Sequence, residues 1–147
     1  MSDLVLDDVD WGIIKILQKN ARTSFMEVAK ELGVSDATIH VRVGKLENSG
    51  VIKKYTIIVD RAKSGKPILV HILVNVDPGK IDFVAKNLVK IEDIDEIHEI
   101  HGRYDMLLKA QSESIEKIRE IIINSVRKIP GVINTEVLTV FKTWKNK

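Results

Sequence analysis

Residues 24–50 read SFMEVAKELGVSDATIHVRVGKLENSG and contain two short helical patterns separated by a glycine. Ser24 and Glu27 form the capping-box pattern that begins a helix. Gly33 lies between the two patterns. A glycine is favoured at the end of a helix because it adopts the left-handed conformation without a steric penalty. A serine then caps a second helix, which we expect to span Ser35–Ser49. This arrangement predicts a helix-turn-helix, although a plain three-helix bundle would have the same outline.

The outward side of the Ser35–Ser49 helix differs from an ordinary solvated surface. At about 100° per residue, Ile39, Val43 and Leu46 point inward. The opposite side carries small and hydrogen-bonding residues instead of the usual Glu and Lys, and includes Gly44 at a cost of about 1 kcal/mol relative to Ala. Small side chains allow a helix to approach base edges in the major groove. The residues that we expect to contact DNA from this helix are Ser35, Asp36, Ala37, Thr38, His40, Val41, Arg42 and Lys45.

Charge alone does not support nucleic-acid binding by this half of the chain. Residues 1–60 hold eight Lys and Arg against nine Asp and Glu. Arg22 precedes the helix that begins at Ser24, and Lys53 and Lys54 follow the Ser35–Ser49 helix. All three are candidates for phosphate contacts, which position a protein without specifying sequence. Single exposed lysines are also often merely solvated. The sequence does not distinguish between two roles for Arg42, a contact with a DNA phosphate and an ion pair with a carboxylate of the protein.

The composition predicts a globular protein that acts in the cytoplasm without a membrane partner. Apolar residues make up 44% of the 147 residues and charged residues 30%, and the longest apolar runs are far too short to span a bilayer. The first ten residues are acidic and do not resemble a signal peptide. The sequence has no cysteine, which excludes disulfides, thiolate metal sites and thiol nucleophiles.

The remaining patterns predict two domains. Asp7, with Asp10 three residues later, caps a first helix, and a strand is expected over Val51–Val59. We therefore expect a helix-turn-helix domain over residues 1–60, a linker over 61–67 and a second domain over 68–147. The elements expected in the second domain are a strand Ile68–Val76, a helix Lys80–Lys90 capped by Asp77 with Pro78 as first residue, strands Glu96–His101 and Tyr104–Ala110, a helix beginning at Ser112 or Ser114, and a strand Val132–Phe141.

The order βαββαβ in the second domain is that of a ferredoxin-like fold, a four-stranded antiparallel sheet with both helices on one face. The whole chain is therefore expected to be α+β. Such a sheet has an uncovered face and free edges, and both invite dimerisation.

The order of motifs along the whole chain resembles the Lrp/AsnC (leucine-responsive, feast/famine) family of transcription regulators. The residues in the first half that carry the resemblance are Leu6-Asp7, Asp10, Ile13, Leu17, Arg22, Leu32-Gly33-Val34-Ser35, Arg42-Val43, Leu46-Glu47, Gly50-Val51-Ile52 and Tyr55. Those in the second half are Gly102-Arg103-Tyr104-Asp105, which resembles a Gly-x-Tyr-Asp signature, and Pro130-Gly131-Val132 with Thr135.

The resemblance implies a winged-type helix-turn-helix joined to a ferredoxin-like effector domain. It also implies dimers that pair through their sheets and assemble further into tetramers or octamers. Each dimer would carry two helix-turn-helix domains, which would suit pseudo-palindromic promoter sites in double-stranded DNA.

By the same resemblance, a small amino acid binds between effector domains as a modulator. The turn Gly102–Asp105 is a reasonable place for it, because a glycine lets backbone N–H groups approach a carboxylate and Asp105 could pair with an ammonium group. A turn of this kind is also common without any ligand. The residues expected at this effector site are His98, Ile100, His101, Gly102, Arg103, Tyr104, Asp105, Thr135 and Thr139.

One departure from the family pattern concerns the last strand. The family often has a Thr-x-Thr pair there, whereas this chain has Thr135-Glu136-Val137. The missing hydroxyl removes one ligand contact and puts the identity of the effector in doubt.

No metal, cofactor or enzymatic activity is expected. His98 and His101 are three residues apart in a predicted strand and would face opposite sides, so they cannot chelate one ion. Two alternatives stay open beside a sequence-specific regulator. One is a DNA-architectural protein of the same fold without an effector, and the other is an enzyme similar to sirohaem decarboxylases.

Overall fold

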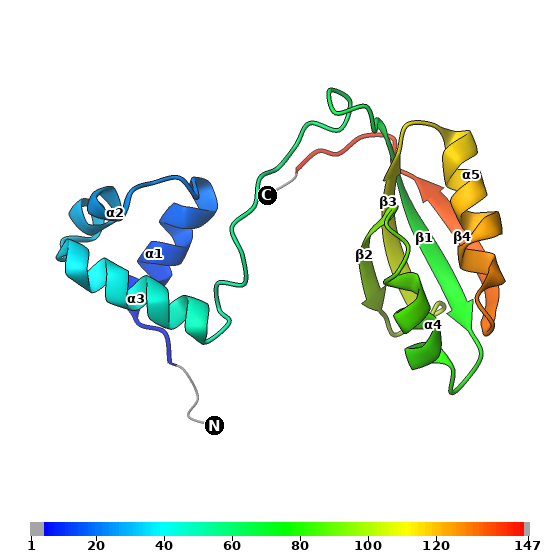
Figure 1. Ribbon diagram of the computed structural model, residues 1–147, viewed down its shortest axis with the longest axis horizontal. Helices are drawn as coiled ribbons and strands as arrows, with labels where there is room; N and C mark the ends of the chain where they lie inside the picture. The colour runs from blue at the N-terminus through cyan, green and yellow to red at the C-terminus, as the bar shows by residue number, and fades with distance from the viewer. Residues whose placement is uncertain (1–4, 146–147) are drawn as a thin grey trace. The chain divides into compact units, whose positions relative to one another are not determined.

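The computed structural model describes residues 5–145, which form two compact units that divide between Ile58 and Val59. The unit before this division contains helices, and the unit after it contains a sheet with helices (Figure 1). Each unit has its own hydrophobic core. Within the described part of the chain, no helix is long and apolar enough to cross a membrane.

The helices of the first unit are α1 (Asp8–Lys19), α2 (Phe25–Leu32) and α3 (Asp36–Asn48). Each begins at its predicted cap, because the side chains of Asp7, Ser24 and Ser35 accept hydrogen bonds from backbone N–H groups of the following turn. Gly33 ends α2 in the left-handed conformation, with φ at 68°. The prediction of a capped helix over Ser35–Ser49 is confirmed.

The core of the first unit fixes one side of α3. Ile39, Val43 and Leu46 of α3 are buried in one cluster with Ile13 of α1 and Val28 of α2. Burial of an aliphatic side chain of this size stabilises a fold by about 1.5–3 kcal/mol. The opposite side of α3 therefore faces outward.

The strand predicted over Val51–Val59 is wrong. None of the strands in residues 5–145 pairs with this segment, and the side chains of Ile57 and Ile58 are 80% and 66% exposed. β-Branched residues favour an extended backbone, but a strand forms only where a neighbour satisfies its N–H and C=O groups.

The second unit has the predicted order βαββαβ. Its elements are β1 (Ile68–Val76), α4 (Ile81–Leu88), β2 (Ile94–Glu99), β3 (Met106–Ser112), α5 (Ile115–Asn124), a short 3-10 helix η1 (Val126–Lys128) and β4 (Val132–Thr139). The sheet has the order β2-β3-β1-β4, and every neighbouring pair is antiparallel. Apolar residues of α4 and α5 share one core with the sheet, so both helices cover the same face (Figure 1).

Neither of the two α-helices described in the second unit covers the other face of the sheet. Ile72 of β1 points into the core, and its neighbours His71 and Leu73 therefore point to the open face. Leu107 of β3 and Leu138 of β4 are the register partners of these two residues and share that face. The Nδ1 atom of His71 is buried without a hydrogen-bond partner.

The predicted cap of α4 is wrong. Gly79 has φ at 80°, and the backbone N–H of Lys80 donates to the carbonyl of Asp77 at 3.0 Å. Pro78 followed by a left-handed glycine makes a β-turn of type II, so Asp77 begins a turn instead of a helix. The helix starts at Ile81 without a side-chain cap.

The strands on either side of the 102–105 turn each lie two residues away from their predicted positions. β2 spans Ile94–Glu99 instead of Glu96–His101, and β3 spans Met106–Ser112 instead of Tyr104–Ala110. The burial of Ile94, which pairs with Ala110 in the core, sets this register. The alternation of apolar residues within one strand does not show that Ile94 pairs with Ala110, so the sequence could not predict this register.

We predict that Ile39→Ala lowers the free energy of unfolding of the first unit by about 2–5 kcal/mol, because it leaves a cavity at a fully buried position. Val41→Ala on the same helix is the matched control, since Val41 is 72% exposed, and should change it by no more than about 0.5 kcal/mol. Urea unfolding followed by Trp11 emission, in a Trp144→Phe background, measures both. Equal effects of the two changes would contradict this core assignment.

Candidate nucleic-acid interface and effector loop

The outward side of α3 is exposed where the sequence predicts DNA contacts. Six of the predicted residues are exposed, and two, Thr38 and Arg42, are half-buried. The exposed ones are Ser35, Asp36, Ala37, His40, Val41 and Lys45. Thr38 is part of the cap, because its N–H donates to Ser35 Oγ at 3.1 Å and the two hydroxyls are hydrogen-bonded at 2.8 Å.

The imidazole of His40 is oriented by two neighbours. Its ring meets the ring of Phe25 of α2 edge to face, with centroids 4.7 Å apart. Its Nε2 lies 3.5 Å from Asp36 Oδ2, one turn earlier on the same helix. His40 is therefore held in a defined direction while its side chain stays 61% exposed.

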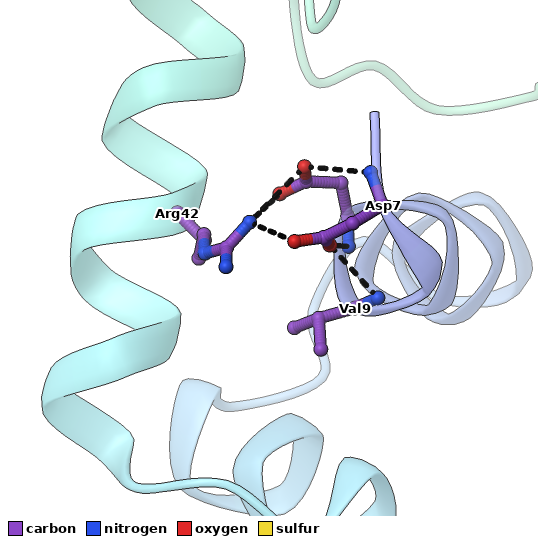
Figure 2. Close-up of polar contacts among 4 residues, drawn as sticks. Asp7, Val9 and Arg42 are labelled. Carbon is purple, nitrogen blue, oxygen red and sulfur yellow. Dashed lines mark hydrogen bonds and ion pairs between the residues drawn. The ribbon is translucent and has the colours of Figure 1, made fainter. Parts of the chain in front are cut away.

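Arg42 is in contact with two carboxylates of the first helix region (Figure 2). Its Nη1 donates to Asp7 Oδ2 at 2.6 Å and to Asp10 Oδ1 at 3.1 Å. Asp10 is fully buried, and its carboxylate also accepts the N–H of Asp7. The sequence leaves two roles for Arg42, a phosphate contact and a structural ion pair. These distances match the structural ion pair.

The same contacts shift the pKa values of the groups involved. The backbone N–H of Asp10, and after it the Arg42 guanidinium, hold the pKa of the Asp7 carboxyl below its ordinary value of 3.8. Hydrogen bonds to Asp7 and Asp10 raise the pKa of Arg42. The sequence places Asp10 three residues after the Asp7 cap and among the residues of the family resemblance, but it does not predict that this carboxylate is buried.

The three predicted phosphate contacts outside α3 are exposed. Arg22 lies in the turn between α1 and α2, and Lys53 and Lys54 follow α3. The segment that carries the lysines is tied to α3 by Tyr55, whose hydroxyl donates to Glu47 Oε1 at 2.9 Å. Desolvation, together with this acceptor, raises the pKa of Tyr55.

In the second unit, the predicted effector turn is anchored to the end of β1. The N–H of Asp105 donates to the Val74 carbonyl at 3.0 Å, and Asp105 Oδ2 accepts the N–H of Val76 at 2.8 Å. The carbonyl of Arg103 accepts from the side-chain amide of Asn75 at 2.9 Å. One oxygen of Asp105 is therefore already used by the fold.

The same turn also contacts the last strand. The hydroxyl of Tyr104 donates to Glu136 Oε2, and this carboxylate, with desolvation, raises the pKa of Tyr104. Glu136 belongs to the part of β4 where the family pattern and this chain differ. Gly102 is exposed with φ at 155°, so the backbone of the turn stays accessible.

Within one chain, the predicted effector residues do not form one pocket. Thr135 pairs with Val74, faces the helices and accepts a hydrogen bond from Arg127 Nε at 2.8 Å. Thr139 pairs with Val70, which places it about 13 Å along the strand from Thr135. His98 pairs with Leu107 on the open face of the sheet.

Other predicted members lie in the loop that follows β2. Ile100 is half-buried and its N–H donates to the Asp105 carbonyl at 2.9 Å, while His101 is exposed. Among residues 5–145, no group of three or more His, Cys, Asp or Glu is placed to hold a metal ion.

Comparison with known proteins gives matches over both units. Residues 6–53 match the model of a winged helix-turn-helix DNA-binding family, and residues 69–147 match the Lrp/AsnC ligand binding domain. The chain is 42% identical over 140 residues to the HTH-type transcriptional regulator FL11 of Pyrococcus abyssi, an alignment that covers 95% of this chain and 92% of the relative.

Two solved structures show the same fold. The structure of Escherichia coli AsnC covers 98% of this chain and 97% of its own, with a TM-score of 0.90 and 29% identity. A transcriptional regulator from Neisseria meningitidis, solved in complex with L-Met, covers 97% of this chain and 94% of its own, with a TM-score of 0.87 and 20% identity.

We predict that Asp7→Asn destabilises the first unit in a pH-dependent way. Asparagine caps helices about as well as aspartate, so this change removes the charge and keeps the cap. Because the folded state lowers the pKa of Asp7, its charge stabilises the fold fully above pH 3.8, and this contribution is lost as the pH falls through the lower folded pKa. The difference in unfolding free energy between wild type and variant should therefore shrink below that pH.

Urea unfolding at a series of pH values, followed by Trp11 emission with Trp144→Phe in both proteins, measures this difference. A difference that stays constant from neutral pH to about pH 3 would exclude a role for the Asp7 charge.

Proposed function

The chain belongs to the Lrp/AsnC family of transcriptional regulators, and we propose that α3 reads its DNA site while a small amino acid binds the second unit and modulates this reading. The chain is thus a DNA-binding regulator with a ligand-binding domain. The relatives reported above are transcriptional regulators, and we propose no enzymatic activity. A cytoplasmic location stays part of the proposal, because chromosomal DNA is the proposed partner. The division into a helix-turn-helix domain over residues 1–60, a linker over 61–67 and a second domain over 68–147 is also part of the proposal.

The observation that carries the DNA assignment is the contrast between the two sides of α3. Its inner side is held by core residues and by Arg42, and its outer side is exposed. Val41 presents an apolar side chain there that is 72% exposed, which suits contact with the methyl group of thymine. His40, fixed by Phe25, suits a hydrogen bond to a base edge.

We further propose distinct roles for the cations near α3. Arg22, Lys45, Lys53 and Lys54 contact phosphates, which set the position of the helix in the groove. Arg42 acts differently, because its guanidinium is bound to the carboxylates of Asp7 and Asp10. It positions α3 relative to α1 without touching DNA.

We propose that the protein acts as a dimer, or a larger oligomer, that binds pseudo-palindromic sites. The open face of the sheet supports self-association, since it carries Leu73, Leu107 and Leu138 beside a buried His71 nitrogen without a partner. Two copies related by a two-fold axis present two α3 helices, which matches two half-sites.

For the effector, we propose an α-amino acid at the loop between β2 and β3. The backbone of Gly102 is accessible to a carboxylate, and the second oxygen of Asp105 has the charge that an ammonium group requires. The related regulator solved with L-Met makes methionine the first amino acid to test. Since the predicted residues do not converge in one chain, a neighbouring copy would complete the site.

We predict that Val41 recognises a thymine methyl group. Sites are first selected from random duplex DNA, and each thymine in the selected site is then replaced by deoxyuridine. At one position per half-site this replacement should weaken binding about fourfold, the equivalent of one buried methyl group at ~0.8 kcal/mol. In Val41→Ala the same replacement should have no further effect.

The matched control is His40→Ala, which should weaken binding to the selected site and retain the effect of the methyl group. If replacing thymine by deoxyuridine weakens the binding of Val41→Ala and of wild type by the same factor, Val41 does not make this contact.

We also predict that Asp105→Asn removes the response to an amino-acid effector. The amide oxygen of asparagine can still accept from the Val76 N–H, so the loop keeps its anchor while the negative charge is removed. The wild type is screened with the twenty amino acids, starting with L-Met, by sedimentation and by DNA affinity. A response of normal size in Asp105→Asn would remove this carboxylate from the ammonium site.

A further inference from the structure

The first unit carries no net positive charge. Residues 1–58 hold eight Lys and Arg against eight Asp and Glu, and one of the cations, Arg42, is bound to two carboxylates. The affinity of proteins for duplex DNA comes largely from cations that neutralise phosphates and release counterions. Cations from another part of the chain would therefore add to the phosphate contacts that we propose for Arg22, Lys45, Lys53 and Lys54.

A cluster of exposed cations lies where the second unit begins and ends. Its members are Arg61, Lys63, Lys66, Lys142 and Lys145, and all but the half-buried Arg61 are exposed. We call this cluster, with residues 60–66 and 140–145 that carry it, the linker–tail surface. The sole acid in these two segments is Asp60.

Hydrogen bonds bring the two segments of this surface together. Arg61 Nη2 donates to Thr143 Oγ1 at 3.1 Å, across 82 residues of sequence (Figure 1 shows the two segments side by side). The N–H of Val140 donates to the Leu69 carbonyl at 2.9 Å, which attaches the tail to β1. In the linker, Lys66 N–H donates to the Arg61 carbonyl at 2.9 Å and closes a turn. The cations are thus presented by an ordered surface.

Aromatic side chains alternate with the cations of the tail. Phe141 and Trp144 are almost fully exposed, and the Lys142 ammonium lies 4.0 Å from the centre of the Trp144 ring. A cation held over an aromatic face is oriented without losing its charge. The lysines beside these rings are exposed and can contact the phosphates of a nucleic-acid backbone.

We propose that the linker–tail surface binds the phosphate backbone of duplex DNA, outside the bases that α3 reads. This inference rests on the proposed DNA binding by α3 and adds a second, sequence-independent contact. The other occupant to consider is a second copy of the chain. A two-fold contact through this surface would bring like charges together, so charge complementarity favours DNA.

The first test compares two triple variants of the full chain with equal net charge. One is Lys66→Gln, Lys142→Gln and Lys145→Gln, on the linker–tail surface. The matched control is Lys86→Gln, Lys90→Gln and Lys128→Gln, whose lysines are exposed elsewhere on the second unit. Binding to a selected site and to unrelated duplex is measured over a range of salt concentrations, and sedimentation gives the oligomeric state of each protein.

The linker–tail variant should bind both duplexes more weakly and keep the ratio between them. The slope of log K against log salt should become smaller by about 0.9 for each phosphate that the variant no longer neutralises, and the control should keep the slope of wild type. An unchanged slope in the linker–tail variant, or an equal change in the control, would overturn the inference. A changed oligomeric mass with an unchanged slope would assign the surface to self-association and would also overturn it.

The second test uses the emission of Trp144. The sequence has two tryptophans, so Trp11→Phe leaves Trp144 as the single reporter. Duplex DNA should quench or shift its emission at low salt, and salt should reverse the change in parallel with release measured by gel mobility. Bound DNA with unchanged emission would overturn the contact at the tail. If wild type bound no duplex at all, the proposed function itself would fail, a result distinct from failure of this surface alone.

Discussion

The ion pairs between Arg42 and the carboxylates of Asp7 and Asp10 are the interaction on which the geometry of the first unit depends. Asp10 is fully buried, and a buried carboxylate without a partner would cost several kcal/mol. Since the partner comes from α3, the fold satisfies this charge only when α3 lies against the start of α1. The contact thus fixes where the outward side of α3, with Val41 and His40, is presented.

The same contact uses two of the acids of the first unit, whose net charge is zero. Two acids at its start, Asp7 and Asp10, form the capping box of α1 and bind Arg42, so they serve the fold and lower the positive potential near α3. Sequence reading and phosphate neutralisation need different side chains, and in our proposal they lie on different surfaces of the chain. Small and apolar residues such as Ala37 and Val41 lie on α3, whereas exposed lysines gather on the linker–tail surface of the second unit.

In the second unit, the loop between β2 and β3 is bound both to β1 and to β4. Asp105 holds the end of β1 through Val76, and Tyr104 reaches Glu136 on β4. A ligand that competed for either carboxylate would alter how the loop is held against the sheet. The open face of that sheet is the surface proposed for self-association. In our proposal, effector binding and assembly would therefore involve the same sheet.

Local rules were sufficient for the helices of the first unit. A cap such as Ser24 and a left-handed end such as Gly33 depend on atoms three or four residues away, so the sequence by itself determined where α2 and α3 begin and end. The βαββαβ order could also be predicted from the sequence, because apolar and polar residues alternate along a strand that buries one face. Sequence also determined which side of α3 is polar, since helical periodicity is fixed by geometry.

Tertiary structure decided everything that needed a distant partner. The segment Val51–Val59 has the composition of a strand, yet no described strand pairs with it. The role of Arg42 depended on Asp10, 32 residues away, and the register of β2 depended on the burial of Ile94. Thr135 and Thr139 share a strand but lie far apart on it. Hydrogen-bonded ladders, buried charges and binding sites join segments that are remote in sequence, and local patterns carry no information about which segments meet.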